Sequence, residues 1–181
     1  MATGFNLEDF KAKFKGGARQ NLFLFNPMFP QSVSTGMNTD EMQYLVRATS
    51  LPETTSEEVL VNWQGYDFKM AGKYTFTDFT CTFNVDMNSK IIHAFDKWMN
   101  HIHNVTTNEY KAPNEYMADQ YLKLLGYTGN VISEYKLFSA WPKTMGAITL
   151  DYATSDVAQF DVTFSYQYHT ITSSQTGGAN S

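Results

Sequence analysis

Histidines are the side chains of this sequence most able to act as general bases or metal ligands, but their spacing favours neither role. His101 and His103 lie two residues apart near the end of a predicted helix. Residues two apart on a helix do not share a face, so this pair is not expected to bind a metal. His93 and His169 have no carboxylate nearby in the sequence that would form a general-base pair. We therefore predict no metal site and no cofactor.

Nucleophile motifs are also missing. The sequence has no G-x-S-x-G segment and no glycine-rich loop opening a helix. Its single cysteine, Cys81, falls on the apolar side of a predicted strand and is expected in the core. One cysteine forms neither an intramolecular disulfide nor a dithiol redox motif. A glycosidase needs two facing carboxylates, and the sequence leaves that possibility open; otherwise we predict no enzymatic activity.

Charge and composition narrow the class of protein. The net charge is −5, whereas a surface that grips nucleic acid needs clustered Lys and Arg. The composition, 43% hydrophobic and 15% aromatic, predicts a packed core and favours strands. The chain shows neither a secretory signal nor an 18-residue apolar run, so we expect synthesis in the cytoplasm and no membrane anchoring. Basic residues cluster near the N-terminus at Lys11, Lys13, Lys15 and Arg19.

A strictly alternating segment, residues 158–169, is the most informative stretch. One of its faces is apolar and is expected to be core: Phe160, Val162, Phe164, Tyr166 and Tyr168. The other face carries short polar groups and only one charge, unlike an ordinary solvated strand face: Gln159, Asp161, Thr163, Ser165 and Gln167.

Residues 53–72, here called the arm, also alternate on both sides of a Gln-Gly pair, which predicts a hairpin. A single chain could hardly bury such a segment, and exposed apolar surface of this kind marks a partner-binding site. Its apolar residues are Val59, Val61, Trp63, Tyr66, Phe68 and Met70.

The remaining elements follow from periodicity. We expect helices at 6–14 and 89–102, the second carrying Ile91, Phe95, Trp98 and Ile102 on one stripe. Strands are expected at 21–25, 41–49 and 73–86, the last changing phase near residues 77 and 78. A strand, turn and strand are expected over 116–138, with the turn at 126–130 and a stop at the "SAWP" segment. Another strand is expected at 147–152.

These elements predict a mainly β protein with one principal α-helix, built as an antiparallel β-sandwich or partly closed barrel. The predicted organisation is an N-terminal amphipathic segment (1–20), a single domain (21–169) containing the arm, and a flexible tail (170–181).

Four segments, in this order, resemble the major tail tube protein family of contractile-tailed bacteriophages. They are "RATSLP" at 47–52, "VNWQGYDFKMAGKYTFTDFTCTFNVD" at 61–86, "AFDKWMN" at 94–100 and "LFSAWPKTMGAITLDYATSDVAQFDVTFSYQYH" at 137–169. The resemblance implies a structural subunit of the virion tail, assembled in the host bacterial cytoplasm. Hexameric rings would stack into a tube in which inner strands of neighbouring subunits form a continuous β-barrel. The implied partners are other copies, a sheath protein, baseplate and tail-terminator proteins, a tape-measure protein and DNA passing without specific binding.

In that architecture the polar residues would face the lumen and the arm would reach between subunits and rings. With no Lys or Arg expected beside them, acidic and neutral groups would let DNA slide. Besides the polar residues of 158–169, the lumen candidates are Thr149, Asp151, Thr80, Thr82, Asn84 and Asp86.

Two alternatives remain open. One is the inner tube of a non-phage contractile injection system. The other is a monomeric β-sandwich that binds or hydrolyses glycans through its carboxylates and through Trp63, Trp98 and Trp141.

Overall fold

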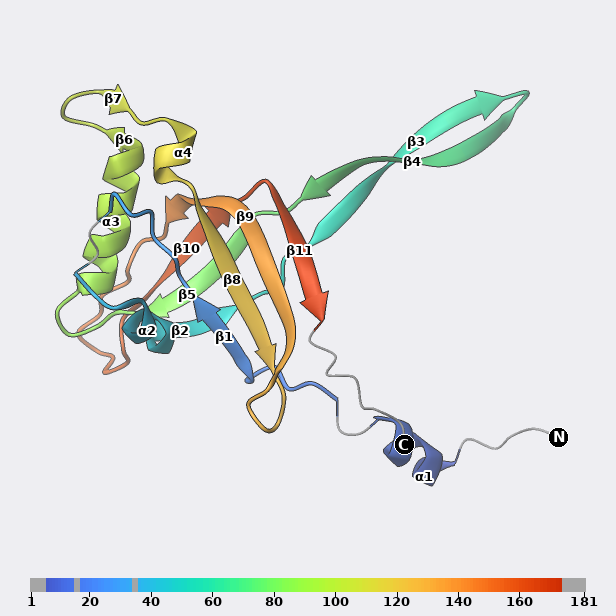
Figure 1. Ribbon diagram of the computed structural model, residues 1–181, viewed down its shortest axis with the longest axis horizontal. Helices are drawn as coiled ribbons and strands as arrows, with labels where there is room; N and C mark the ends of the chain where they lie inside the picture. Colours follow the sequence, from blue (N-terminus) through green and yellow to red (C-terminus); the bar gives the residue numbers. More distant parts are fainter. Residues whose placement is uncertain (1–5, 15–16, 34–35, 174–181) are drawn as a thin grey trace.

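The computed structural model describes residues 6–14, 17–33 and 36–173. Seven of its strands form one continuous antiparallel arrangement, whose two halves, here called the two sheets, share one strand and pack face to face (Figure 1). The terminal residues 1–5 and 174–181 lie outside this description. The strand order is β1-β8-β9-β10-β5-β2, and β11 also pairs with β9. The strands span Phe23–Asn26 (β1), Val46–Thr49 (β2), Phe79–Asn84 (β5), Ala118–Leu125 (β8), Val131–Met145 (β9), Gln159–Ser165 (β10) and Tyr168–Ser173 (β11).

The long strand β9 belongs to both sheets. Its first part pairs with β8 and β11, and its last part pairs with β10. Between them, Ser139 has a positive φ of 53°, and its backbone N–H donates to Asp119 Oδ1 at 3.0 Å. This bend carries β9 through the "SAWP" segment, where the sequence predicted a stop. The sheets are not closed on themselves, and the prediction of a mainly β sandwich or partly closed barrel with one principal helix is confirmed.

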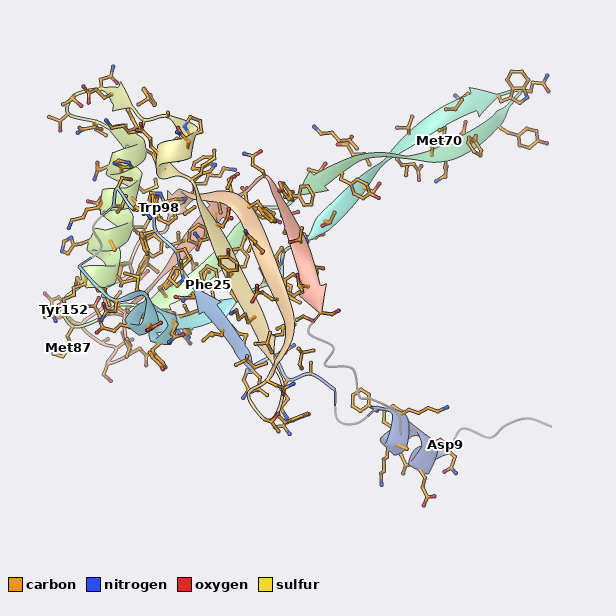
Figure 2. The ribbon with its side chains drawn as sticks, viewed as in Figure 1. Asp9, Phe25, Met70, Met87, Trp98 and Tyr152 are labelled. Atoms are coloured by element: carbon orange, nitrogen blue, oxygen red, sulfur yellow. The ribbon has the colours of Figure 1, made fainter. Side chains whose placement is uncertain are left out.

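The core lies between the sheets and under the helix α3 (Lys90–Ile102). Phe25 of β1 packs on Phe79 with ring centroids 5.2 Å apart, and Phe95 of α3 packs on Phe83 at 5.1 Å. Figure 2 shows Phe25 within the sandwich and Trp98 on α3. The predicted helix and its apolar stripe are confirmed, since Ile91, Phe95 and Trp98 are buried.

The α3 helix is capped by a residue that precedes its N-cap position. Ser89 has a positive φ of 53° and makes no capping hydrogen bond with its side chain. Instead, Asp86 Oδ1 accepts the backbone N–H of Ile91 at 3.1 Å. Burial alone would raise the pKa of Asp86, but this and other backbone donors outweigh it and lower that pKa.

The short elements lie around the sandwich. The predicted strand at 41–49 is mostly wrong, because only its last part is extended; the rest is helical, which buries Met42 and leaves Tyr44 exposed. The predicted N-terminal helix is confirmed, with Asn6 Oδ1 accepting the N–H of Glu8. These elements are α1 (Leu7–Phe14), α2 (Thr39–Met42), the 3-10 helix η1 (Gln43–Leu45), β6 (His103–Asn104), β7 (Glu109–Tyr110) and α4 (Pro113–Tyr116).

The arm is a separate two-stranded hairpin, β3 (Thr54–Trp63) and β4 (Tyr66–Phe76), that projects away from the sandwich (Figure 1). Gln64 and Gly65 form its turn with φ of 48° and 87°. Two consecutive positive φ values match the twist of a tight hairpin. The predicted hairpin is confirmed, and the arm extends to Phe76. The predicted phase change falls at the two residues that separate β4 from β5.

Two C-terminal predictions need correction. Residues 146–158 contain no strand, although their alternation predicted one at 147–152. Residues 170–173, assigned to the flexible tail, instead extend β11 along β9, with Thr170 opposite Lys136. The strand, turn and strand over 116–138 are confirmed as β8 and β9.

Gln120 provides a test of the core. It is fully buried on β8, where its amide accepts the N–H of Met28 at 2.9 Å and donates to the Met28 carbonyl at 2.7 Å. We expect Gln120→Leu to lower the free energy of unfolding by about 1–3 kcal/mol, because the part-buried backbone N–H and carbonyl of Met28 lose their partner. Chemical denaturation would measure this. Lys123→Leu, which removes only a half-exposed ion pair with Glu134, is the control. Equal stability of both variants would contradict the expectation.

Candidate functional site

The polar face lies on the outer side of β5 and β10, away from the core. Thr80 is opposite Thr163, Thr82 is opposite Asp161, and Asn84 is opposite Gln159. The two threonine hydroxyls of the first pair lie 3.1 Å apart, and Thr82 Oγ1 donates to Asp161 Oδ1 at 2.6 Å. Side chains of the polar face therefore form hydrogen bonds with one another across the two strands. Asp161 is the one acidic residue among them. The face consists of Thr80, Thr82, Asn84, Gln159, Asp161, Thr163 and Ser165.

An arginine borders the polar face, contrary to the expectation that no Lys or Arg would lie there. Arg47 of β2 is exposed and donates a hydrogen bond to the side chain of Gln159. Since β2 pairs with β5, the short strand brings this guanidinium to the edge of the face. Its charge is thus held beside the Gln159 amide.

Four lumen candidates are not on the strands that form the polar face. Thr149 and Asp151 are exposed in the 146–158 loop and not on a strand. Asp86 caps α3. Gln167 falls in the break between β10 and β11, where its N–H donates to the Phe138 carbonyl at 3.1 Å. The same break exposes Tyr168, which was expected in the core.

The arm carries its six apolar candidates on a single face. Val59 is opposite Met70, Val61 is opposite Phe68, and Trp63 is opposite Tyr66. All of them are exposed, from 44% for Val61 to 80% for Tyr66 (Met70 is labelled in Figure 2). The other face is mainly polar and includes the Glu58–Lys69 ion pair at 3.0 Å. An exposed stripe of this kind is typical of a contact surface.

Where the arm leaves the sandwich, an aromatic cluster surrounds His169. Its ring lies 5.5 Å from Phe76 and 5.9 Å from Tyr166. Burial lowers the pKa of His169, so it is neutral at neutral pH, and its Nε2 lies 3.5 Å from Thr54 Oγ1. This packing holds the base of the arm, and no carboxylate bonds to the imidazole within the described residues.

The structure offers little for catalysis. Burial raises the pKa of the Cys81 thiol, so it is a core residue and not a nucleophile. Over the described part of the chain, no group of three or more His, Cys, Asp or Glu side chains is placed to hold a metal. In residues 6–14, 17–33 and 36–173, no helix has the length and apolarity needed to cross a membrane.

Comparison with known proteins gives consistent results. Residues 11–172 match the phage tail tube protein family. The tail tube protein of Serratia phage KSP90 is 27% identical over 157 residues, covering 86% of this chain and 89% of the relative. In fold, the chain is similar to one in the anti-feeding prophage tube terminating cap, with a TM-score of 0.65, 16% identity and coverage of 86% and 91%. It is also similar to one in the sheath-tube complex of the extracellular contractile injection system PVC, with a TM-score of 0.65, 15% identity and coverage of 93% and 98%.

Proposed function

Because the chain belongs to the phage tail tube protein family and is a structural tail tube subunit rather than an enzyme, we propose that it forms hexameric rings. The rings stack into a tube through which DNA passes during ejection. It is a component of the virion tail, and we propose that it assembles in the host bacterial cytoplasm.

The observation that carries this proposal is the four-stranded sheet formed by the end of β9 with β10, β5 and β2. Among the described strands, β2 pairs only with β5, and residues 141–145 of β9 pair only with β10. Both edges of this sheet are therefore open, and open edges are suited to pairing with another chain. We propose that β2 of one subunit pairs with the end of β9 in the next, which closes a continuous barrel.

The dimensions suit DNA. With four strands from each subunit of a hexamer, ~4.8 Å strand spacing and ~40° tilt, the backbone circle is roughly 48 Å across. Duplex DNA fits after the inner side chains are placed. In this arrangement the polar face lines the channel, where its neutral side chains and Asp161 give phosphates nothing to bind. Arg47 lies at the subunit junction, at the border of the polar face, where it donates a hydrogen bond to the neutral Gln159 side chain.

The arm supplies the contacts between subunits and rings, since its apolar face is exposed in the single chain. Further partners are a sheath protein, baseplate and tail-terminator proteins and a tape-measure protein. The fold relative in a sheath-tube complex supports the sheath partner, and the fold relative in a tube terminating cap supports the tail-terminator partner. The alternative, a tube of a non-phage injection system, is favoured only by fold similarity, whereas the family and the Serratia phage relative favour DNA.

Negative-stain electron microscopy of the purified, concentrated chain, with light scattering, tests the proposal. We expect rings or hollow tubes, because the open sheet edges and the arm are exposed in every monomer. A protein that stays monomeric at all concentrations would contradict self-closing rings and would direct attention to glycan binding.

A further inference from the structure

In the described part of the chain, no surface covers the apolar face of the arm. At its tip, Trp63, Tyr66 and Phe68 are 70%, 80% and 63% exposed. The tip also carries Asp67, opposite Asn62, for which the described residues provide no ion-pair partner. The tip thus carries three aromatic side chains on one face of the hairpin and one unpaired carboxylate on the opposite face.

A groove of about 900 Å³ lies at the open side of the sandwich, between the segment leading into β1 and the strand β2. Phe23, Leu122 and Leu124 provide apolar lining from one sheet, and Val46 provides it from the other. The groove exists because β1 and β2 are the terminal strands in the sheet order and do not pair with each other.

The groove complements the arm tip in charge. Arg19 and Arg47 both line it, and its described lining includes no Asp or Glu. Arg19 lies over the Tyr127 ring at 5.3 Å and Arg47 bonds to the neutral Gln159, so neither guanidinium is neutralised by these contacts. A carboxylate such as Asp67 would find two cations there.

The two surfaces lie at different ends of the molecule. Figure 1 shows the arm projecting toward the upper right, whereas β1 begins and β8 ends near the β8–β9 turn at the bottom. The groove contains Phe23 and Leu124 from those two ends. An arm therefore does not reach the groove of its own chain. A contact between the arm of one copy and the groove of the next joins unlike surfaces, so it can repeat from copy to copy and build an open stack.

We propose that the groove between β1 and β2 receives the arm tip of a second copy of this chain. The tip enters between the two walls of the groove, so that its aromatic face covers the apolar lining. Asp67, on the opposite face of the hairpin, approaches Arg19 or Arg47. The outer edge of β1, which pairs with no other described strand, additionally offers backbone groups to the hairpin. This inference rests on the proposed function and deepens it, because it identifies where the arm binds.

Cross-linking between two cysteine variants tests the contact. One chain carries Gln64→Cys at the arm turn, and the other, with a size tag, carries Ser50→Cys at the groove. Cys81 is fully buried and does not react in the folded protein. The chains are mixed, concentrated, treated with a short bismaleimide and separated by mass. We expect a heterodimer band at least tenfold stronger than that from a matched mixture with Thr107→Cys, an exposed position in the β6–β7 turn.

Electron microscopy of the same samples separates this inference from the proposed function. Tubes with the heterodimer band support both. Tubes whose Ser50→Cys mixture cross-links no more than the Thr107→Cys control overturn the arm-to-groove contact and leave the tube function standing. A strong heterodimer band without rings or tubes would support the arm-to-groove contact and contradict ring closure. If neither the band nor rings or tubes appear, the contact and the tube function are both overturned.

Discussion

Tubes are not expected to form from the Trp63→Ala, Phe68→Ala double variant, although its monomer folds as the wild type does. Both side chains are mostly exposed in the single chain, so their loss removes no core contact. In a stacked assembly each would be buried, and full burial of an aromatic side chain contributes about 1.5–3 kcal/mol. Every subunit loses both contributions, so we expect at least a hundredfold loss of sedimentable tubes at the wild-type assembly concentration.

The matched control for this variant lies on the same arm. Leu60→Ala removes apolar surface from the opposite face, where Leu60 pairs with Lys69. We expect its tube yield to stay within a factor of two of wild type, with equal thermal unfolding for all three proteins. Normal tubes from the double variant would show that the apolar face of the arm does not hold the assembly together.

The arm could be predicted from the sequence because its signals are local. Alternation with a period of two fixes which side chains share a face, and the Gln-Gly turn fixes the register of the two strands. Together they place Val61 beside Phe68 and Trp63 beside Tyr66. The apolar side of β10 followed from the same alternation, as Phe160, Val162 and Phe164 are buried.

Alternation failed for residues 146–158 and for the residues around position 42. In residues 146–158, Leu150 and Tyr152 are exposed, because β10 already pairs with β9 on one side and β5 on the other. Around residue 42, acidic residues Asp40 and Glu41 favour a helical turn, which places Met42 and Tyr44 on different sides. The state of a predicted partner strand and the start of a short helix both depend on more than alternation, so this pattern alone does not reveal them.

The polar face was only partly predictable, since its composition depends on contacts between distant segments. Arg47 and Gln159 are separated by 112 positions and meet only because β2 and β10 flank β5. Asp86 alternates in phase with Thr80 and Thr82, but it lies beyond the end of β5 and caps α3. The family resemblance suggested a role for this face, and the pairing of β5 with β10 shows which residues form it.

Replacing Thr163 and Ser165 by Lys is expected to turn a channel that lets DNA slide into one that holds it. Both residues lie on the polar face, half-buried, and the long stem of Lys lets its ammonium group reach the solvent of the channel. Two added cations per subunit would bind DNA phosphates. The logarithm of the binding constant then falls linearly with the logarithm of the salt concentration, with a slope of about −0.9 for each phosphate contacted. Short duplex DNA should then become protected from nuclease in variant tubes at low salt and be released at high salt.

The same two positions changed to Gln provide the control, because Gln adds length without charge. We expect wild-type and Gln tubes to protect little DNA at any salt concentration, and the Lys variant to protect at least tenfold more at low salt. Tubes of normal yield must form in all three cases, since β10 keeps its strand pairing with β5 and β9. If the Lys and Gln tubes protected equal amounts of DNA, the polar face would not line the channel, and the sheet would have to be oriented differently within the ring.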